Sequence, residues 1–116
     1  MIQIRTFQSQ DTEQIVNLIL TIQQVEFQVP ITIQDQPDLL EIPNFYQQGN
    51  GNFWVAVQGD EVVGTIALID CGGPIGAIRK MFVKKEFRGK ELGIAQKLLD
   101  TLTTKAQEAQ MQHLYL

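Results

Sequence analysis

Apolar and polar residues alternate at the start of the chain and then recur at helical spacing. Ile2 and Ile4 alternate with polar neighbours, so residues 2–7 are predicted to form a half-buried strand. After a polar break at residues 8–11, the apolar period becomes helical and predicts a helix over residues 12–24, with Asp11 as its N-cap. The helical positions are Ile15, Leu18, Ile19 and Ile22.

The middle of the chain changes from an irregular segment to strands. Residues 25–50 contain three prolines, so only a short helix starting near Asp38 is expected there. The β-prone residues 53–57 and 61–69 flank Gly59-Asp60, which predicts a β-hairpin. A turn at residues 71–74 and a third strand over residues 76–84 would complete an antiparallel meander.

The last third of the chain predicts a helix and one further strand. From Leu92 onward the apolar residues follow helical spacing, with Ala95, Leu99 and Leu102 on the same stripe. This helix would cover one face of the sheet. Residues 112–116, which end on Leu114-Tyr115-Leu116, then predict a strand parallel to its neighbour, as expected after a crossover helix.

Composition indicates one domain with an uneven charge distribution. The 116 residues carry a net charge of −4, which divides into −8 for residues 1–78 and +4 for residues 79–116. Six of the nine Lys and Arg residues lie between Arg79 and Lys90, which favours a local anionic ligand over nucleic acid. A single cysteine, Cys71, and the absence of a signal peptide or a bilayer-spanning apolar run predict a cytoplasmic protein.

The connection from the third strand into the last long helix has the features of an anion-binding site. A helix start leaves N–H groups without intrahelical partners, and the helix dipole adds about half a positive charge there. Gly93 and Ala95 would let a ligand approach this backbone closely, and Arg88 and Lys90 add positive charge. The pattern predicts a cradle for phosphate, with a solvated strand–turn–helix connection as the alternative.

Two runs at this turn resemble motif A of the GNAT acyltransferases: Val83-x-x-Glu86-Phe87-Arg88-Gly89-Lys90 and Gly93-x-Ala95-x-x-Leu98-Leu99. The family pattern is Gln/Arg-x-x-Gly-x-Gly/Ala, and Lys90-x-x-Gly93-x-Ala95 matches it with Lys in the first position. The loop is two residues longer than usual, so Arg88 and Lys90 are both candidates to contact a pyrophosphate. The resemblance implies that acetyl-coenzyme A (acetyl-CoA) binds here through Met81, Phe82, Val83, Arg88, Gly89, Lys90, Leu92, Gly93, Ile94 and Ala95.

The resemblance also implies a fold. It is an α+β fold of three layers, in which a mixed, mainly antiparallel twisted sheet has helices on both faces, as in the GNAT-like acyl-CoA acyltransferases. Residues 1–116 would form a single domain of this kind, short at the C-terminus, because residues 112–116 correspond to only the fifth strand of the pattern. Three explanations stay open: a fragment of a longer enzyme, a sheet completed by a second copy in a homodimer, or a non-catalytic binder.

The implied activity is transfer of an acetyl group from acetyl-CoA to a primary amine of a small molecule or peptide, by direct attack in a ternary complex. The alternative is a non-catalytic CoA-binding or dimerising module. Neither reading involves a metal, nucleic acid or a membrane, because no Cys/His cluster, P-loop, dinucleotide-binding fingerprint or nucleic-acid motif is present.

No catalytic residue is assigned from the sequence. The family's acid, a tyrosine, would lie on a helix after Leu116. The candidates for the general base are Glu26, Glu41 and Asp70, and nothing in the sequence selects among them. A packing or structural role is favoured for Phe27, Phe45, Tyr46, Cys71, His113 and Tyr115. The alternative for the first three is that they form the wall of an acceptor pocket.

Overall fold

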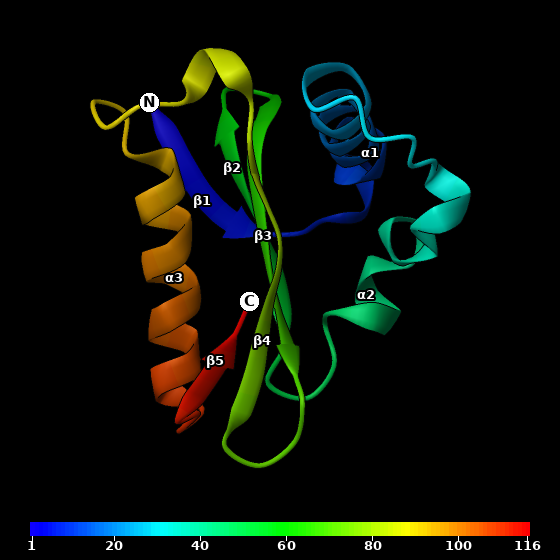
Figure 1. The fold of residues 1–116 in the computed structure, drawn as a ribbon. Helices are drawn as coiled ribbons and strands as arrows, with labels where there is room; N and C mark the ends of the chain where they lie inside the picture. The colour runs from blue at the N-terminus through cyan, green and yellow to red at the C-terminus, as the bar shows by residue number, and fades with distance from the viewer.

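The hydrophobic runs of the chain form one five-stranded sheet in a computed structural model that describes residues 1–116. The strands lie in the order β1-β2-β3-β4-β5, with antiparallel pairing between the first four and parallel pairing between β4 and β5 (Figure 1). This confirms the predicted hairpin, the meander and the parallel last strand. The strands are β1 Ile2–Thr6, β2 Asn52–Gln58, β3 Glu61–Asp70, β4 Ile75–Val83 and β5 His113–Tyr115.

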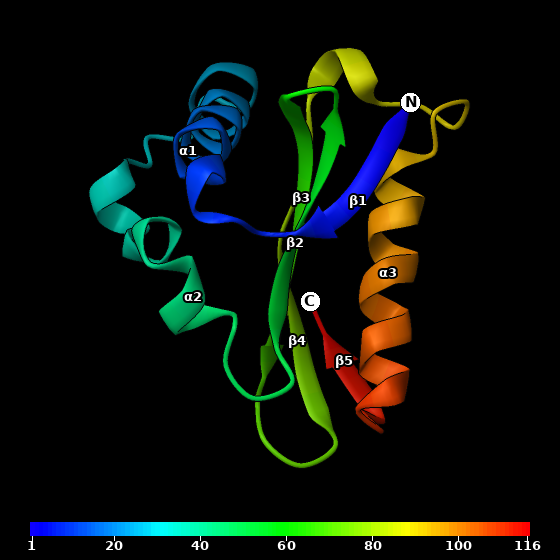
Figure 2. The same ribbon diagram turned by 180° about the vertical axis from the view of Figure 1, so that it is seen from behind.

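Helices cover both faces of this sheet, with α1 and α2 on one face and α3 on the other (Figures 1 and 2). The predicted first helix is an α-helix only to Leu20 and then continues as a π-helical segment. The helical elements are α1 Thr12–Leu20, the π-helical η2 Thr21–Glu26, α2 Ile42–Phe45, α3 Ile94–Glu108, and the 3₁₀ turns η1 Ser9–Asp11, η3 Ile33–Asp35, η4 Pro37–Leu40 and η5 Lys85–Phe87. None of the helices has both the length and the apolar character that a membrane crossing requires.

Strand β2 divides the hydrophobic core into two halves because successive side chains of a strand point to opposite faces. Phe53 and Val55 pack with Ile15 and Ile19 on the α1 face. On the α3 face, Trp54 belongs to a second cluster of buried side chains, which also contains Ile66, Ile94, Leu98 and Leu102. The central strands are therefore buried on both faces, and functional groups are confined to the ends and edges of the sheet.

Three local predictions are corrected by the structure. Leu92 lies in the turn before α3, 42% exposed, because the helix starts only at Ile94 after Gly93. Asp11 precedes α1 as expected, but its carboxylate binds Arg5 and the Gln8 amide instead of the α1 amides. Phe27 and Phe45 are exposed, so core packing holds for Tyr46 alone among the three aromatic residues.

Candidate functional site

The start of α3 is shaped by a glycine in a conformation that other residues rarely adopt. Gly93 occupies the N-cap position with φ +61°, in the left-handed region, and its N–H donates to the Gly89 carbonyl oxygen (3.2 Å). The Gly93 carbonyl oxygen then accepts the first helical hydrogen bond from Lys97 (3.0 Å). This geometry ends the loop from β4 sharply and leaves the first helical amides facing away from the helix.

Those amides have no partners inside the protein. The N–H groups of residues 89–92 and of residues 94–96 donate to no backbone or side-chain acceptor. A Cβ added at Gly93 would meet only the Lys90 carbonyl oxygen, at 3.8 Å, and one at Gly89 would meet nothing within 4 Å. Glu91, in the same loop, accepts no hydrogen bond and belongs to no ion pair. The helix start is therefore an open row of donors with the polarity that suits an anion.

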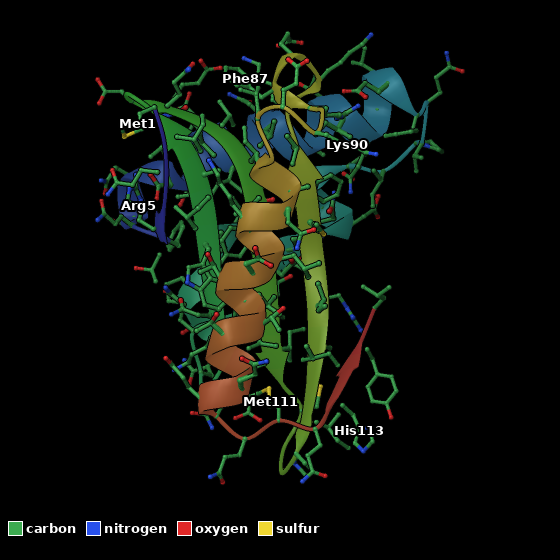
Figure 3. All side chains as sticks on the ribbon, turned by 90° about the vertical axis from the view of Figure 1, so that its left-hand side faces the viewer. Met1, Arg5, Phe87, Lys90, Met111 and His113 are labelled. Atoms are coloured by element: carbon green, nitrogen blue, oxygen red, sulfur yellow. The ribbon has the colours of Figure 1, made fainter.

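The cations around this helix start are not equivalent. Arg88 is fully engaged: its guanidinium donates to both carboxylate oxygens of Glu26 (2.8 and 2.9 Å), and its Nε donates to the Val83 carbonyl oxygen (2.8 Å). Lys90 forms no ion pair and lies in the loop at the head of α3 (Figure 3). Of the two residues that the sequence left as candidates, Lys90 is thus the cation that is free to meet a ligand in this structure.

Strand β4, which leads into this loop, has one edge that is only partly paired. It pairs with β5 at Ile75–Ala77 alone, because β5 spans only His113–Tyr115 (Figure 3). Residues 78–83 consequently have no strand on that side. The expected arm-binding residues Met81, Phe82 and Val83 lie on this stretch, directly before the loop. The structure therefore places the two parts of the predicted site next to each other, an open strand edge followed by an open helix start.

A bulge interrupts β4 within this open stretch. The register against β3 shifts between Thr65 and Ala67, and Lys80 has a positive φ of +53°. The buried Thr65 hydroxyl donates to the Lys80 carbonyl oxygen (2.7 Å), while Lys80 Nζ donates to Gln36 Oε1 (2.6 Å) and lies 3.5 Å from an Asp38 carboxylate oxygen. These contacts hold a strained residue in place and tie β4 to the segment before α2.

The same segment contains a buried tyrosine whose proton is firmly held. Tyr46 donates its hydroxyl hydrogen to Asp38, and burial together with this hydrogen bond raises the pKa of Tyr46 far above its ordinary value. Sequence reasoning favoured packing for Tyr46 and did not find its hydrogen-bond partner Asp38, nor Lys80, which lies beside Asp38 and donates to Gln36. No local pattern marks them, because they come together only when the segment folds onto β4.

The three base candidates lie in different surroundings. Glu26 is bound by Arg88. Asp70 accepts the amides of Asn50 and Gly72, which lowers the pKa of its carboxyl, and it lies at the end of β3 opposite the start of β4, away from α3's first turn. Glu41 is exposed and has only a long hydrogen bond from Asn44 (3.4 Å). The structure thus brings Glu26 alone next to the predicted site.

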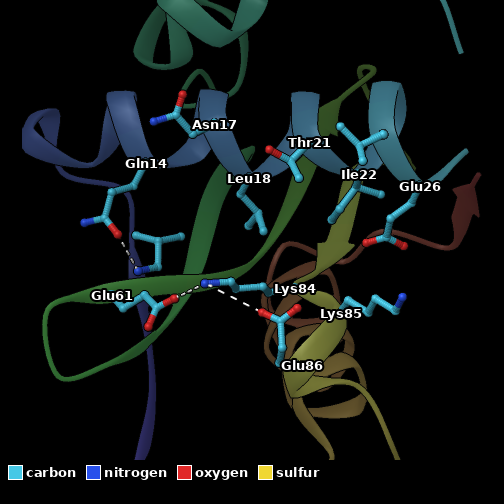
Figure 4. A pocket seen from close by; sticks show the side chains of 12 residues that line it. Gln14, Asn17, Leu18, Thr21, Ile22, Glu26, Glu61, Lys84, Lys85 and Glu86 are labelled. Carbon is cyan, nitrogen blue, oxygen red and sulfur yellow. Dashed lines mark hydrogen bonds and ion pairs between the residues drawn. The ribbon is translucent and has the colours of Figure 1, made fainter. Parts of the chain in front are cut away.

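A cavity of about 470 Å³ opens on the α1 face (Figure 4). It lies between the helical segment 14–26, the first residues of β3 and the residues that follow β4. Its wall includes Glu26 and an ion group in which Lys84 pairs with Glu61 and, at 3.8 Å, with Glu86. The hydrogen bond to Glu61 raises the pKa of Lys84. Lys84 is therefore neutralised by its neighbours and adds little to the positive field at the start of α3.

Comparisons with known proteins agree with this architecture. The family model described as the acetyltransferase (GNAT) family matches residues 16–116. A GNAT-family acetyltransferase from Staphylococcus aureus Mu50 is similar in structure with a TM-score of 0.90 and 36% identity, over 96% of this chain and 70% of that one. An acetyltransferase from Streptococcus agalactiae 2603 has a TM-score of 0.92 and 27% identity, over 97% of this chain and 70% of the other.

A third structure shares the fold at lower identity. It is a protein from Clostridium acetobutylicum described as a predicted acetyltransferase with acetyl-CoA, with a TM-score of 0.77 and 22% identity, over 98% of this chain and 79% of that one. The comparison with curated proteins found no matching sequence.

Proposed function

Because this chain belongs to the acetyltransferase (GNAT) family, we propose that it transfers the acetyl group of acetyl-CoA to a primary amine of a small molecule or peptide. The single observation that carries the proposal is the row of unpartnered amides at the start of α3, directly after the open edge of β4. Unsatisfied donors at a helix start, opened further by a glycine, are suited to a diphosphate.

The residues of the chain would divide the work of binding. The amides of residues 89–92 and 94–96 and the ammonium group of Lys90 would hold the diphosphate of acetyl-CoA. The backbone of Met81, Phe82 and Val83 would align its pantetheine arm along β4. Bound acetyl-CoA would supply the activated thioester. A neutral amine would then attack the thioester carbonyl directly, so that a C–N bond forms as the C–S bond breaks and the thiol leaves.

Proton transfer is the part for which the chain offers no assigned residue. Tyr46 keeps its proton and is bonded to Asp38, and Glu26 is bonded to Arg88. These two hydrogen-bonded pairs favour the second candidate function, a module that binds CoA without catalysing acetyl transfer. Pairing with a second copy and a cytoplasmic location stay predictions.

Calorimetry with acetyl-CoA and with CoA, followed by a thiol-release assay with a mixture of primary amines, tests the proposal. The proposed enzyme binds both molecules and releases CoA only when amine is present. Binding without amine-dependent release assigns the chain to the module instead. If neither molecule binds, both readings are wrong.

A further inference from the structure

Arg88 makes three hydrogen bonds that connect separate parts of the molecule. Its guanidinium binds both oxygens of Glu26, 62 residues away at the end of the π-helical segment, and its Nε binds the last carbonyl of β4, that of Val83. The Glu26 side chain is only 18% exposed, and that of Arg88 is 38% exposed. Paired, charge-assisted bonds of this geometry are stronger than single neutral ones, so the arginine has a defined position.

This position conflicts with the use of Val83 by a ligand. A pantetheine arm that pairs along the open edge of β4 needs the outward groups of residues 81–83. In this structure Arg88 lies against one of them, the Val83 carbonyl oxygen. Full pairing of the arm therefore requires Arg88 to leave that oxygen, and the guanidinium then needs another anionic partner.

The nearest available partner would be the diphosphate itself. Arg88 directly precedes Gly89, whose φ of +124° and empty surroundings give the loop room to turn the side chain. The amides that would hold the diphosphate begin at Gly89. A diphosphate carries more negative charge than the single carboxylate of Glu26, and it would lie beside the donors of the helix start.

Resting on the function proposed above, we infer that Arg88 exchanges partners when CoA binds, from Glu26 and the Val83 carbonyl to the diphosphate. Glu26 is then a positioning residue that competes with the ligand. It keeps Arg88 ordered in the free protein, and it lowers the affinity for CoA by the cost of breaking its own pair. Lys90, which has no such internal partner, is available to the diphosphate from the start.

A set of charge-neutralising variants separates this exchange from a structural ion pair. Glu26→Gln removes the competing charge and keeps the shape of the side chain. By calorimetry it should bind CoA about three- to tenfold more tightly than the unmodified chain, while its ligand-free thermal midpoint falls. Glu86→Gln is the matched control, because it removes the same charge from the wall of the same cavity without touching Arg88, and its affinity for CoA should stay within twofold, about the limit for a well-exposed charge.

The increase in CoA affinity caused by Glu26→Gln must also depend on Arg88. In an Arg88→Gln background, Glu26→Gln should leave the affinity unchanged, since no guanidinium remains to be released. Should Arg88→Gln fail to fold, Arg88→Lys, which keeps the charge but loses the paired geometry, takes its place and should shrink the gain.

The outcomes distinguish the exchange from the function on which it rests. Equal or weaker binding by Glu26→Gln, or the same gain with and without Arg88, overturns the exchange while binding by the unmodified chain upholds the function. Absence of CoA binding in every folded variant overturns both.

Discussion

The two long helices of this chain begin in opposite ways. At the start of α1 the protein supplies its own anions: Glu13 lies in the first turn, and the buried Asp11 accepts the Gln8 amide (2.8 Å) and both guanidinium nitrogens of Arg5 (2.8 and 2.9 Å). At the start of α3 the first turn contains no acidic residue, the cap is Gly93, and the amides have no partner.

This difference separates a helix start stabilised by the protein's own side chains from one that is open to an anion, as the proposed function requires. Both starts carry the positive end of a helix dipole, but the 3₁₀ turn before α1 gives the Asp11 and Thr12 amides the acceptors Gln8 and Ser9. The carboxylate of Asp11 makes the region before α1 a closed polar unit that needs nothing from outside. The start of α3 keeps its positive potential and exposes it, so it can accept an anion from solution.

Gly93→Glu should remove the difference between the two helix starts and have the largest effect on CoA affinity, because it places a bulky carboxylate where the diphosphate should lie. We expect CoA binding to weaken about 100-fold or more, which corresponds to about 2.7 kcal/mol. The side chain also costs about 1 kcal/mol of stability at a positive φ. Gly73→Glu is the matched control, since Gly73 has φ +55° and open surroundings in the β3–β4 turn. Equal affinities for CoA in the two variants would contradict the site.

Asp11→Asn tests the closed helix start, and its effect should be on stability with no change in affinity for CoA. Burial acts to raise the pKa of Asp11, but hydrogen bonds from Arg5 and Gln8 hold it below its ordinary value. Loss of the charge should lower the free energy of unfolding by about 2 kcal/mol at pH 7. Because the folded-state pKa is lowered, the stabilisation is full above the unfolded value near 4 and is lost as the pH falls through the folded value.

Urea unfolding at a series of pH values measures this effect. The stability difference between Asp11→Asn and the unmodified chain should be largest near neutral pH and shrink below about pH 4. Asp60→Asn, in the β2–β3 turn, controls for the loss of one charge. A difference that stays constant down to pH 3 would assign the effect to shape instead of ionisation.

Local sequence predicts the hairpin well and the start of α3 to within two residues. The hairpin follows from the β-prone runs on either side of Gly59-Asp60, whereas the helical period placed the start of the last helix at Leu92 instead of Ile94. The two arginine ion pairs differ in how far apart their partners lie in the sequence. Arg5 and Asp11 are six residues apart, whereas Arg88 and Glu26 are brought together across 62 residues by the fold. Contacts of the second kind leave no periodic trace in the sequence.

The π-helical segment and the bulge at Lys80 escaped prediction for a related reason. Residues 21–26 are compatible with an ordinary helix, and in the structure they form a π-helical segment that ends at Glu26, the partner of Arg88. Lys80 has no intrinsic preference for a positive φ, and its contacts with Thr65, Gln36 and Asp38 impose it. Tertiary contacts decide the conformation at both places.

Lys90→Gln measures how much the free cation adds to the amides at the start of α3, because it removes the charge and keeps the amides. We expect CoA to bind about five- to tenfold more weakly, or about 1–1.4 kcal/mol, and the loss should shrink as salt rises. Lys105→Gln removes the same charge from the last turn of α3 and should leave the affinity unchanged. A loss that is independent of salt would show that Lys90 acts through packing instead of charge.

The smallest changes in affinity and stability are expected when one acidic residue near each helix start is neutralised. Glu91→Gln removes a carboxylate without internal partners from the loop before α3, and it should raise the affinity for CoA about twofold by reducing repulsion. Glu13→Gln removes a carboxylate from the first turn of α1, and it should lower the free energy of unfolding by about 0.3–0.5 kcal/mol through the helix dipole, with CoA affinity unchanged. Calorimetry and urea unfolding on the same two proteins check both halves. If Glu91→Gln altered stability as Glu13→Gln does and left CoA binding unchanged, the start of α3 would be a second closed helix start.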